Sequence, residues 1–406
     1  MKSNKRPGIR GWALLISVAL CMTGCLAGGN SSSNSAPSGS SNSSPNPGQN
    51  VLPIIVDAGP DPVDAPSVNV PFVSVTICAP GTSNCQTIDH IIVDTGSTGL
   101  RVISSVLSPS LALTQQTAGG NQLAECMRYA DGYAWGSIKA ADLKLDGESV
   151  NSLAIQVIDP SYANIPSSCS NSGPAENTVA TFGGNGILGV SGFQQDCGPG
   201  CAQTVPPGTY YACAGAACQP VAVALAQQLQ NPVGLLGYDN NGVIIDLPAV
   251  ADTGAATVTG SLILGIGTQS DNSLGNAVVY ALDPNYGTLT TTFNRQSYPG
   301  SFIDSGSNGT FFPDVATTPV CNSGFYCPAS PQQLTATNLG TNGSSGIVSF
   351  NVANADSLLS TANTAFSNLA GPTFGTASFD WGLPFHFGRR VYTGIEAGGS
   401  GPYVAY

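Results

Sequence analysis

The chain has 406 residues, a mass of 41.0 kDa and 42% hydrophobic residues, so it can bury the core of one large or two medium domains. Only 8% of the residues are charged, and 11 basic against 23 acidic residues give a net charge of −12. A general nucleic-acid binder is excluded, because few cationic side chains are present to neutralise phosphates. The two histidines, His90 and His386, are not clustered, and we expect no metal site and no cofactor.

Residues 1–24 are predicted to be a signal peptide. Four basic side chains precede an apolar run over residues 12–20, which is too short to span a membrane as a helix. The Met-Thr-Gly-Cys sequence at residues 22–25 resembles the lipobox of bacterial lipoproteins, in which cleavage precedes the cysteine and the cysteine is lipidated. The resemblance implies a palmitate-bearing Cys25 that anchors the protein in the bacterial cell envelope, in the outer membrane because no aspartate follows the cysteine. The alternative is an ordinary secretory signal cleaved near the same place.

Residues 25–65 are predicted to comprise the lipidated cysteine and a flexible tether. Residues 28–50 are almost only Ser, Asn, Gly and Pro, a composition that cannot bury a core. Residues 57–66 carry three aspartates among prolines, and we interpret them as an extended acidic linker because their spacing matches no calcium-binding loop. The folded part is therefore expected to begin near residue 66.

The cysteines predict disulfides. Of the 12 cysteines, Cys21 leaves with the signal peptide and Cys25 takes the lipid, and the even remainder in an oxidising compartment predicts five disulfides. Local hairpins are expected to be closed by Cys78 with Cys85 and by Cys321 with Cys327, and a longer loop by Cys126 with Cys169. The other four share one Gly/Pro-rich insertion and allow three pairings: Cys197, Cys201, Cys213 and Cys218. A four-thiolate zinc site is the weaker alternative for these four, because no Cys-x-x-Cys spacing occurs.

The rest of the chain alternates short β-branched runs with turn clusters, and its 50 glycines and 29 prolines also favour a mainly β fold. Helical patterns occur only over residues 221–230 and 356–369. One pattern occurs twice: an apolar strand ends in Asp-Thr-Gly-Ser at residues 94–97 and in Asp-Ser-Gly-Ser at residues 304–307. A single such turn is a weak signal, whereas two copies about one lobe apart are a much stronger one.

Asp94 and Asp304 are the candidate catalytic residues. Two carboxyl groups that lie close together cannot both ionise easily, so they share a proton. One can then take a proton from water as a general base while the other donates to a substrate carbonyl. The adjacent glycines let the backbone approach each carboxylate, and the adjacent hydroxyl groups can orient it. A serine hydrolase is disfavoured because no Gly-x-Ser-x-Gly motif with a suitable histidine occurs.

Further motifs make the chain resemble the pepsin-like aspartic protease family over roughly residues 66–406. Residues 129–136 resemble its flap hairpin, 186–189 and 381–385 its two hydrophobic-hydrophobic-Gly elements, 262–265 the strand entering the interlobe region, and 389–393 the closing strand. The resemblance implies a bilobal fold with two pseudo-symmetric β lobes and a cleft between them. Its N-terminal lobe would span residues 66–265, with the flap and the interlobe strand, and its C-terminal lobe residues 266–406. We also suspect a bacterial lipoprotein subgroup of this fold.

The resemblance implies roles for individual residues. The implied site consists of the catalytic pair Asp94 and Asp304, the cross-bracing Thr95 and Ser305, Ser97 and Ser307 as donors to the outer carboxylate oxygens, Gly96 and Gly306, and the flap residues Tyr129, Gly132 and Trp135. The chain departs from the family at Arg101, where an aromatic residue usually contacts the flap tyrosine, and Trp135 is the candidate substitute. Pro384 stands where the family prefers an acidic residue. No Lys or Arg occurs over residues 11–100, which excludes a basic prosegment that blocks the aspartates.

The sequence therefore predicts an aspartic endopeptidase that uses activated water and forms no covalent intermediate. Its expected partners are a peptide or unfolded protein substrate and the membrane, reached through an N-terminal lipid, with no nucleic acid, and we expect a monomer. The alternative is a catalytically inactive lipoprotein of the same fold that binds peptides or has a structural role in the envelope. A cleft filled by the insertion over residues 197–218 would favour that alternative.

Overall fold

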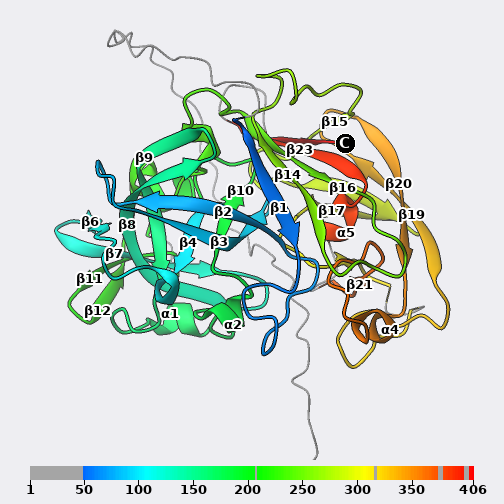
Figure 1. The fold of residues 1–406 in the computed structure, drawn as a ribbon, viewed down its shortest axis with the longest axis horizontal. Helices are drawn as coiled ribbons and strands as arrows, with labels where there is room; N and C mark the ends of the chain where they lie inside the picture. The colour runs from blue at the N-terminus through cyan, green and yellow to red at the C-terminus, as the bar shows by residue number, and fades with distance from the viewer. Residues whose placement is uncertain (1–48, 206–207, 315–317, 374–377, 397–401) are drawn as a thin grey trace, which may run out of the picture.

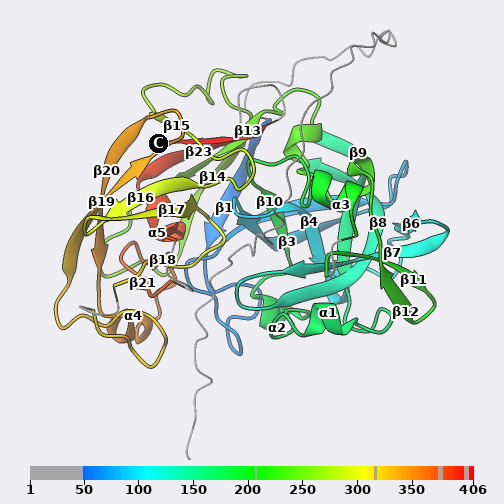
Figure 2. The same ribbon diagram turned by 180° about the vertical axis from the view of Figure 1, so that it is seen from behind.

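The computed structural model describes residues 49–205, 208–314, 318–373, 378–396 and 402–406. The predicted signal peptide, Cys25 and the tether up to residue 48 lie outside the described residues. The chain forms two β-rich halves that meet at a central layer of strands (Figure 1), and the view from behind shows the same division (Figure 2). The mainly β architecture agrees with the fold class predicted from the sequence.

The strands form a larger and a smaller sheet. The larger sheet contains β1 (Val51–Val56), β2 (Pro71–Cys78), β3 (Cys85–Asp94), β4 (Thr98–Ile103), β5 (Thr114–Gln115), β6 (Thr117–Ala118), β7 (Asn121–Arg128), β8 (Tyr133–Leu145), β9 (Glu148–Ile158), β10 (Gly186–Val190), β11 (Tyr210–Ala214), β12 (Ala217–Pro220), β13 (Gly242–Leu247), β14 (Val258–Leu264), β15 (Val279–Ala281), β23 (Arg389–Gly394) and β24 (Tyr403–Ala405). The smaller sheet contains β16 (Leu289–Phe293), β17 (Gln296–Ile303), β18 (Thr310–Phe311), β19 (Gln332–Leu339), β20 (Ser345–Val352), β21 (Ala370–Gly371) and β22 (Asp380–Trp381). The helices are α1 (Ser167–Ser170), α2 (Val179–Phe182), α3 (Pro199–Gln203), α4 (Ala355–Leu359) and α5 (Leu383–His386), with 3₁₀ turns η1 (Ser104–Val106), η2 (Leu225–Gln227) and η3 (Val233–Leu235).

The first half is built from long antiparallel strands around an aliphatic core. β2 pairs with β3 and β8, and β8 pairs with β9. The end of β3 is an uninterrupted apolar run, Ile91 to Val93, because β2 and β10 flank it and both of its faces are buried. This run leads directly into Asp94, so the first carboxylate stands at the end of a rigid, buried strand.

A layer of six strands, paired in the order β1, β14, β13, β23, β24 and β15, joins the two halves. The prediction of a tether as far as residue 65 is wrong at its C-terminal end, because residues 51–56 form β1 of this layer. Ile54 and Val56 are fully buried there, and their backbones pair with Gly260 and Val258 of β14. The alternating burial of β1 is that of a strand with one face on the core, so folded structure begins at β1 rather than near residue 66.

The core of the second half is rich in aromatic side chains. Phe312 stacks on Phe379 with ring centroids 5.2 Å apart, and the ring centroids of Trp381 and Phe379 are 4.4 Å apart. The Trp381 indole Nε1 donates to Oδ1 of Asn338 at 3.1 Å, which satisfies its polar edge inside the core. Trp381 thereby anchors the two-residue strand β22 against this core.

The two predicted helices are far shorter than expected. Residues 221–230 contain only η2, and within residues 356–369 the helix α4 ends at Leu359. After α4 the hydroxyls of Ser360 and Thr361 donate to the carbonyls of Ser357 and Leu358 at 2.8 Å, so side chains compete with continued helical backbone bonding. Among the described residues, no helix is both long enough and apolar enough to cross a membrane.

All ten cysteines from Cys78 onward form disulfides, as the sequence predicts. The three pairs expected from spacing are present: Cys78–Cys85, Cys126–Cys169 and Cys321–Cys327. Of the three pairings left open in the insertion, the structure contains Cys197–Cys201 and Cys213–Cys218. In these two disulfides none of the four cysteines is a free thiol, so they cannot form the four-thiolate zinc site.

Candidate active site

The two Asp-containing loops meet through a reciprocal pair of hydrogen bonds. The backbone N–H of Thr95 donates to Oγ of Ser305, and the backbone N–H of Ser305 donates to Oγ1 of Thr95, both at 3.0 Å. The Ser305 hydroxyl donates in turn to the carbonyl of Val93 at 2.8 Å, and that of Thr95 to the carbonyl of Ile303 at 3.4 Å. Each loop is thus held by the strand that enters the other, which is the cross-brace implied for Thr95 and Ser305.

The cross-brace brings the two carboxyl groups together over two glycines. The N–H of Gly96 donates to Oδ1 of Asp94 at 2.7 Å, and that of Gly306 to Oδ1 of Asp304 at 2.8 Å. A Cβ on Gly96 would lie 2.7 Å from Cγ of Asp304, and one on Gly306 would lie 2.6 Å from Oδ1 of Asp94. Any side chain at either glycine would push one carboxyl group away from the other loop, which explains the residue type at both positions.

The electrostatics of the pair favour one shared proton. Asp94 is 0% exposed and Asp304 is 1% exposed. Burial is the largest cause that raises the pKa of Asp304 well above its usual range, and the charges of Asp94 and Asp380 and the contact with the Asp94 carboxyl raise it further. The hydrogen bond from Ser307 opposes this shift. The two carboxyl groups therefore hold one shared proton more tightly than an isolated carboxyl group would.

The serines that follow the two motifs make unequal contacts. The Ser307 hydroxyl donates to Oδ2 of Asp304 at 2.9 Å, as the resemblance implies. The equivalent bond from Ser97 is absent: its buried hydroxyl and Oδ2 of Asp94 both lack a hydrogen-bond partner among the described residues. That part of the prediction is wrong, because Ser97 lies near Asp94 in the sequence without donating to its carboxylate.

One short strand runs behind each Asp loop in equivalent register. β10 runs parallel to β3 with Ile92 opposite Ile187 and Asp94 opposite Gly189. β22 runs parallel to β17 with Phe302 opposite Asp380, and the N–H of Asp304 donates to the carbonyl of Trp381 at 3.1 Å. β10 is the first expected hydrophobic-hydrophobic-Gly element. The second was expected over residues 381–385, but the strand behind the second loop is Asp380–Trp381, and Leu383–His386 form α5 instead. β22 therefore carries a carboxyl group at the position where β10 carries Ile187.

β7 and β8 form the predicted flap hairpin, closed by the turn at residues 129–132. The N–H of Tyr129 donates to the carbonyl of Gly132 at 2.8 Å, and the Tyr129 ring lies edge-on to Phe182 with centroids 5.8 Å apart. Burial is the main reason that the pKa of Tyr129 is raised; the charge of Arg101 opposes the shift, and the charges of Glu125, Asp94 and Asp131 add to it. Asp131 was not singled out from the sequence, and burial in this turn raises its pKa to about 6.

Trp135 does not replace the missing aromatic partner of the flap tyrosine. Its indole Nε1 donates to the carbonyl of Tyr162 at 2.6 Å, and its ring packs edge-on against Tyr211 with centroids 5.4 Å apart. The hydroxyl of Tyr129 has no hydrogen-bond partner among the described residues. Trp135 therefore belongs to the packing of the hairpin's outer side, and the sequence-based expectation for it is wrong.

The position of the missing aromatic residue is taken by a buried ion network. Arg101 in β4 donates from Nη2 to Oε1 of Glu125 at 2.7 Å and from Nε to Oε2 at 3.3 Å, and its Nη2 also lies 3.3 Å from Oδ2 of Asp196. The hydroxyl of Tyr210 donates to Oδ1 of Asp196 at 2.7 Å. Glu125 and Asp196 were missed in the sequence because nothing local to them shows that an arginine would lie beside them.

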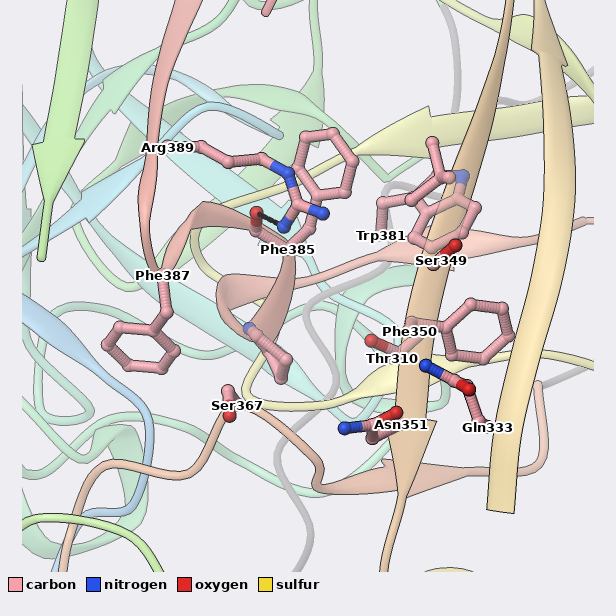
Figure 3. A pocket seen from close by; sticks show the side chains of 12 residues that line it. Thr310, Gln333, Ser349, Phe350, Asn351, Ser367, Trp381, Phe385, Phe387 and Arg389 are labelled. Atoms are coloured by element: carbon pink, nitrogen blue, oxygen red, sulfur yellow. Dashed lines mark hydrogen bonds between the residues drawn. The ribbon is translucent and has the colours of Figure 1, made fainter. Parts of the chain in front are cut away.

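A pocket opens in the second half between β20 and α5 (Figure 3). Its walls include Trp381, Phe385 and Phe387, and Pro384 also lines it. The guanidinium of Arg389 lies 4.6 Å from the Phe385 ring centroid and donates to the Phe385 carbonyl at 2.6 Å. Neither Asp94 nor Asp304 lines this pocket, so it is separate from the pair.

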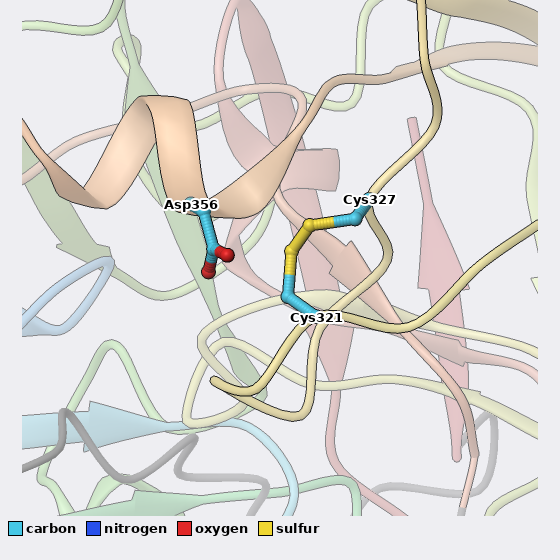
Figure 4. A group of neighbouring side chains, drawn as sticks. All are labelled: Cys321, Cys327 and Asp356. Carbon is cyan, nitrogen blue, oxygen red and sulfur yellow. A yellow bond between two sulfur atoms is a disulfide. The ribbon is translucent and has the colours of Figure 1, made fainter.

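The described residues contain one cluster of potential metal-ligating side chains, formed by Cys321, Cys327 and Asp356 (Figure 4). The two sulfur atoms are joined in a disulfide and are not thiolates, which are the form that binds metals. Asp356 is exposed on α4 and accepts a hydrogen bond from Ser323 at 3.3 Å. This group fits a structural loop closure better than a metal site.

Comparison with known proteins supports the fold. The chain matches 336 chains of solved structures, among them an aspartic proteinase from Irpex lacteus. That structure has a TM-score of 0.50 and 12% sequence identity, and the match covers 87% of this chain and 96% of the proteinase. At this identity the similarity establishes the fold, which is that of the pepsin-like aspartic proteinases, and no more.

Sequence comparison assigns the chain to one family. No curated protein is significantly similar to it in sequence. A family described as "Protein of unknown function (DUF3443)" matches residues 46–406, which include every described strand and helix and both Asp-containing loops. The protein therefore belongs to the DUF3443 family and has the fold of a pepsin-like aspartic proteinase.

Proposed function

We propose that this protein is an aspartic endopeptidase that hydrolyses peptide bonds with water activated by Asp94 and Asp304. The observation that carries the proposal is the pair of buried carboxyl groups, held face to face by the reciprocal Thr95–Ser305 hydrogen bonds. A buried pair of carboxyl groups is costly to ionise fully, so the two groups share a proton. Such a pair is suited to simultaneous general acid and general base catalysis.

The proposed reaction follows from the unequal surroundings of the two carboxyl groups. We assign the shared proton to Asp304, whose pKa burial raises; Asp304 then donates a hydrogen bond and afterwards the proton to the carbonyl oxygen of the scissile peptide. Asp94 is the carboxylate that takes a proton from the attacking water. The resulting tetrahedral intermediate collapses when its C–N bond breaks: the leaving nitrogen receives the proton from Asp94, and one hydroxyl of the intermediate returns its proton to Asp304 as the carbonyl bond re-forms. No bond forms between enzyme and substrate at any step.

The flap supports a peptide as the substrate class. The turn at residues 129–132, which begins with Tyr129, ends a long hairpin that can close over an extended chain. The insertion over residues 197–218 adds β11 to the outer edge of this hairpin, where Tyr210 pairs with Glu125. Its strands therefore extend the hairpin's sheet, which gives little support to the alternative of a filled cleft and a binding-only protein.

The deciding experiment measures proteolysis by the full-length exported protein. Unfolded protein substrates are offered between pH 3 and 7 to the wild type and to the Asp94→Asn and Asp304→Asn variants. We expect wild-type cleavage and a loss of roughly 10²–10⁴-fold or more in each variant, because each amide removes one partner of the proton transfer. The matched control is Asp252→Asn, an exposed aspartate away from both loops, which should cleave like the wild type.

A folded wild type that cleaves none of these substrates at any pH would contradict the enzyme proposal. Circular dichroism of the same samples establishes that they are folded. Equal cleavage by the wild type and both Asn variants would also contradict it, since a contaminating protease would then be the source. The unpartnered Ser97 hydroxyl is the observation that favours the binding-only alternative, and peptide binding without turnover would be its signature.

We also propose that Cys25 carries the lipid that anchors the protein in the bacterial envelope, at the outer membrane. The proposal rests on the lipobox-like sequence at residues 22–25 and on the Ser/Asn/Pro/Gly tether that follows it. Cys25→Ser should abolish incorporation of labelled palmitate and move the protein from the membrane fraction to the soluble fraction. The control is Cys21→Ser, which lies inside the predicted signal peptide and should leave both properties unchanged. Unaltered labelling of Cys25→Ser would refute the anchor.

A further inference from the structure

The second Asp-containing loop has a third carboxyl group behind it. Asp380 is 0% exposed and lies in β22, with Phe302 of β17 on one side and Phe311 of β18 on the other. Neither of its oxygens makes a hydrogen bond of ordinary geometry with the described residues. A buried carboxyl group in that condition is costly, so its presence needs an explanation beyond packing.

The pseudo-symmetry of the two halves shows that packing does not require an acid here. In the first half Ile187 occupies the register position that Asp380 occupies in the second, two residues before the position opposite the catalytic aspartate. Ile187 is fully buried in an apolar cluster that includes Tyr129 and Phe182. An aliphatic side chain thus fills the buried space at this strand position in the first half, whereas the second half has a carboxyl group there.

Asp380 is linked to the pair through Ser307 and through charge. The Ser307 hydroxyl, which donates to Asp304, also interacts with Asp380 and stabilises its ionised form, although burial outweighs this effect and raises the pKa of Asp380 well above its usual range. The charge of Asp94 raises the pKa of Asp380 further. Conversely, a negative charge on Asp380 raises the pKa of Asp304.

No other charged group on the neighbouring elements compensates Asp380. β18 and β21 carry no ionisable side chain, and β17 carries only Tyr298, whose pKa burial raises so that it stays neutral. In α5, which follows β22, burial lowers the pKa of His386 to about 3, so the ring is neutral in the working range. The guanidinium of Arg389 in β23 contacts the Phe385 ring and donates a hydrogen bond to the Phe385 carbonyl. The two catalytic carboxyl groups are therefore the charges that Asp380 faces.

We propose that Asp380 is a third carboxyl group of the active site, a positioning residue that extends the singly protonated state of the Asp94–Asp304 pair toward neutral pH. When Asp380 is ionised, its charge opposes loss of the proton that Asp304 must donate to the substrate. The pair then remains in its working form at a higher pH than two carboxyl groups alone would allow. This inference rests on the proposed function and adds the pH range over which the site works.

The first test compares the pH dependence of kcat/KM for the full-length exported protein and its Asp380→Asn variant. The amide keeps the shape and a hydrogen-bond donor but cannot ionise. We expect the alkaline limb of the profile to move toward acid by about one pH unit, which is a roughly tenfold loss at pH 7 with little change near pH 4. Asp380→Ile, which copies the first half, should shift the limb in the same direction. Asp252→Asn should leave the profile unchanged.

The second test does not depend on cleavage. Unfolding free energies of the wild type, Asp304→Asn, Asp380→Asn and the double variant form a double-mutant cycle between pH 4 and 8. We expect coupling between the two sites that changes with pH, because ionisation of one carboxyl group disfavours ionisation of the other. Such coupling in a protein that cleaves nothing would support the three-carboxyl cluster and reject the proposed function. A wild-type pH profile for Asp380→Asn, or additive effects at every pH, would overturn the proposal.

Discussion

Arg101 is a single residue whose charge is entirely buried in the first half. Its side chain is 0% exposed. Its partners are Glu125 of β7 and Asp196, the residue just before the insertion, so segments distant in the chain supply the two carboxylates that neutralise it. The pKa of Asp196 is raised, first by burial and then by the charge of Glu125, while Arg101 opposes the shift. This ion network stands where the family has an aromatic contact with the flap tyrosine. It holds β4 and β7 together by ion pairs rather than by apolar packing.

Replacing Arg101 with methionine should destabilise the protein strongly. The variant leaves Glu125 and Asp196 buried without their cation, which costs about 3–5 kcal/mol in the free energy of unfolding. Urea denaturation of the exported protein measures this loss. The control is Arg390→Met, because Arg390 is partly exposed and its Nε lies 3.7 Å from Oδ2 of Asp246, a pair worth about 0–1 kcal/mol. Equal losses in the two variants would contradict a structural role for the buried network.

At the scale of elements, the flap hairpin is tied down along its outer side. Cys126 of β7 is joined to Cys169 of α1, and the N–H of Tyr133 donates to the carbonyl of Pro174 at 2.9 Å. Tyr210 of β11 pairs with Glu125 of β7. Opening of the flap must therefore be confined to the turn at residues 129–132 and its immediate neighbours, since the body of the hairpin moves only with these partners.

The doubled motif could be recognised from the sequence because its signal is local. Strand, aspartate, hydroxyl and glycine follow one another directly, so Asp94, Asp304 and their glycines were identifiable without knowledge of their contacts. Asp380 and Glu125 could not be identified, because their significance depends on strand register and on partners far along the chain. β1 was missed for a related reason: its six residues acquire strand structure by pairing with β14, about 200 residues later.

Element lengths were less predictable than element positions. The flap hairpin, the strand behind the first Asp loop and the closing strand lie where the motifs indicate, whereas the strand behind the second loop begins one residue earlier and most of its motif is α5. The apolar pattern over residues 221–230 suggested a helix, yet its backbone is satisfied by tertiary contacts instead: the N–H of Val223 donates to the carbonyl of Cys201 at 2.8 Å, and that of Leu229 to the Tyr210 hydroxyl at 2.8 Å. Such contacts override a short helical pattern.

For the whole molecule, the buried carboxyl groups determine how stability depends on pH. Burial raises the pKa values of Asp196, Asp304 and Asp380, and that of Asp131 to about 6. The folded state therefore holds protons that the unfolded chain releases above about pH 4, so stability falls as pH rises from about 4 through the folded pKa values. His386 acts in the opposite sense, because its pKa is lowered to about 3 and the unfolded chain gains a proton below about pH 6.5.

We predict that the protein is more stable at pH 4–5 than at pH 8. Several carboxyl groups with raised pKa values make the folded state more stable toward acid, and a single histidine has the opposite effect. The carboxyl groups therefore determine how the free energy of unfolding changes with pH. Urea midpoints measured between pH 3 and 8 should rise toward acid, and the rise should be smaller in Asp380→Asn. Unfolding between pH 5 and 3, followed by circular dichroism, would refute the prediction.

The disulfides form a simple series along the chain. From Cys78 onward each bond joins a cysteine to the next one in sequence, and four of the five span separations of only 4 to 7 residues. If the chain enters an oxidising compartment from its N-terminus, an oxidant that couples each thiol to the next one to emerge produces the native set without later rearrangement. Maturation of this protein should therefore require a thiol oxidase and no disulfide isomerase.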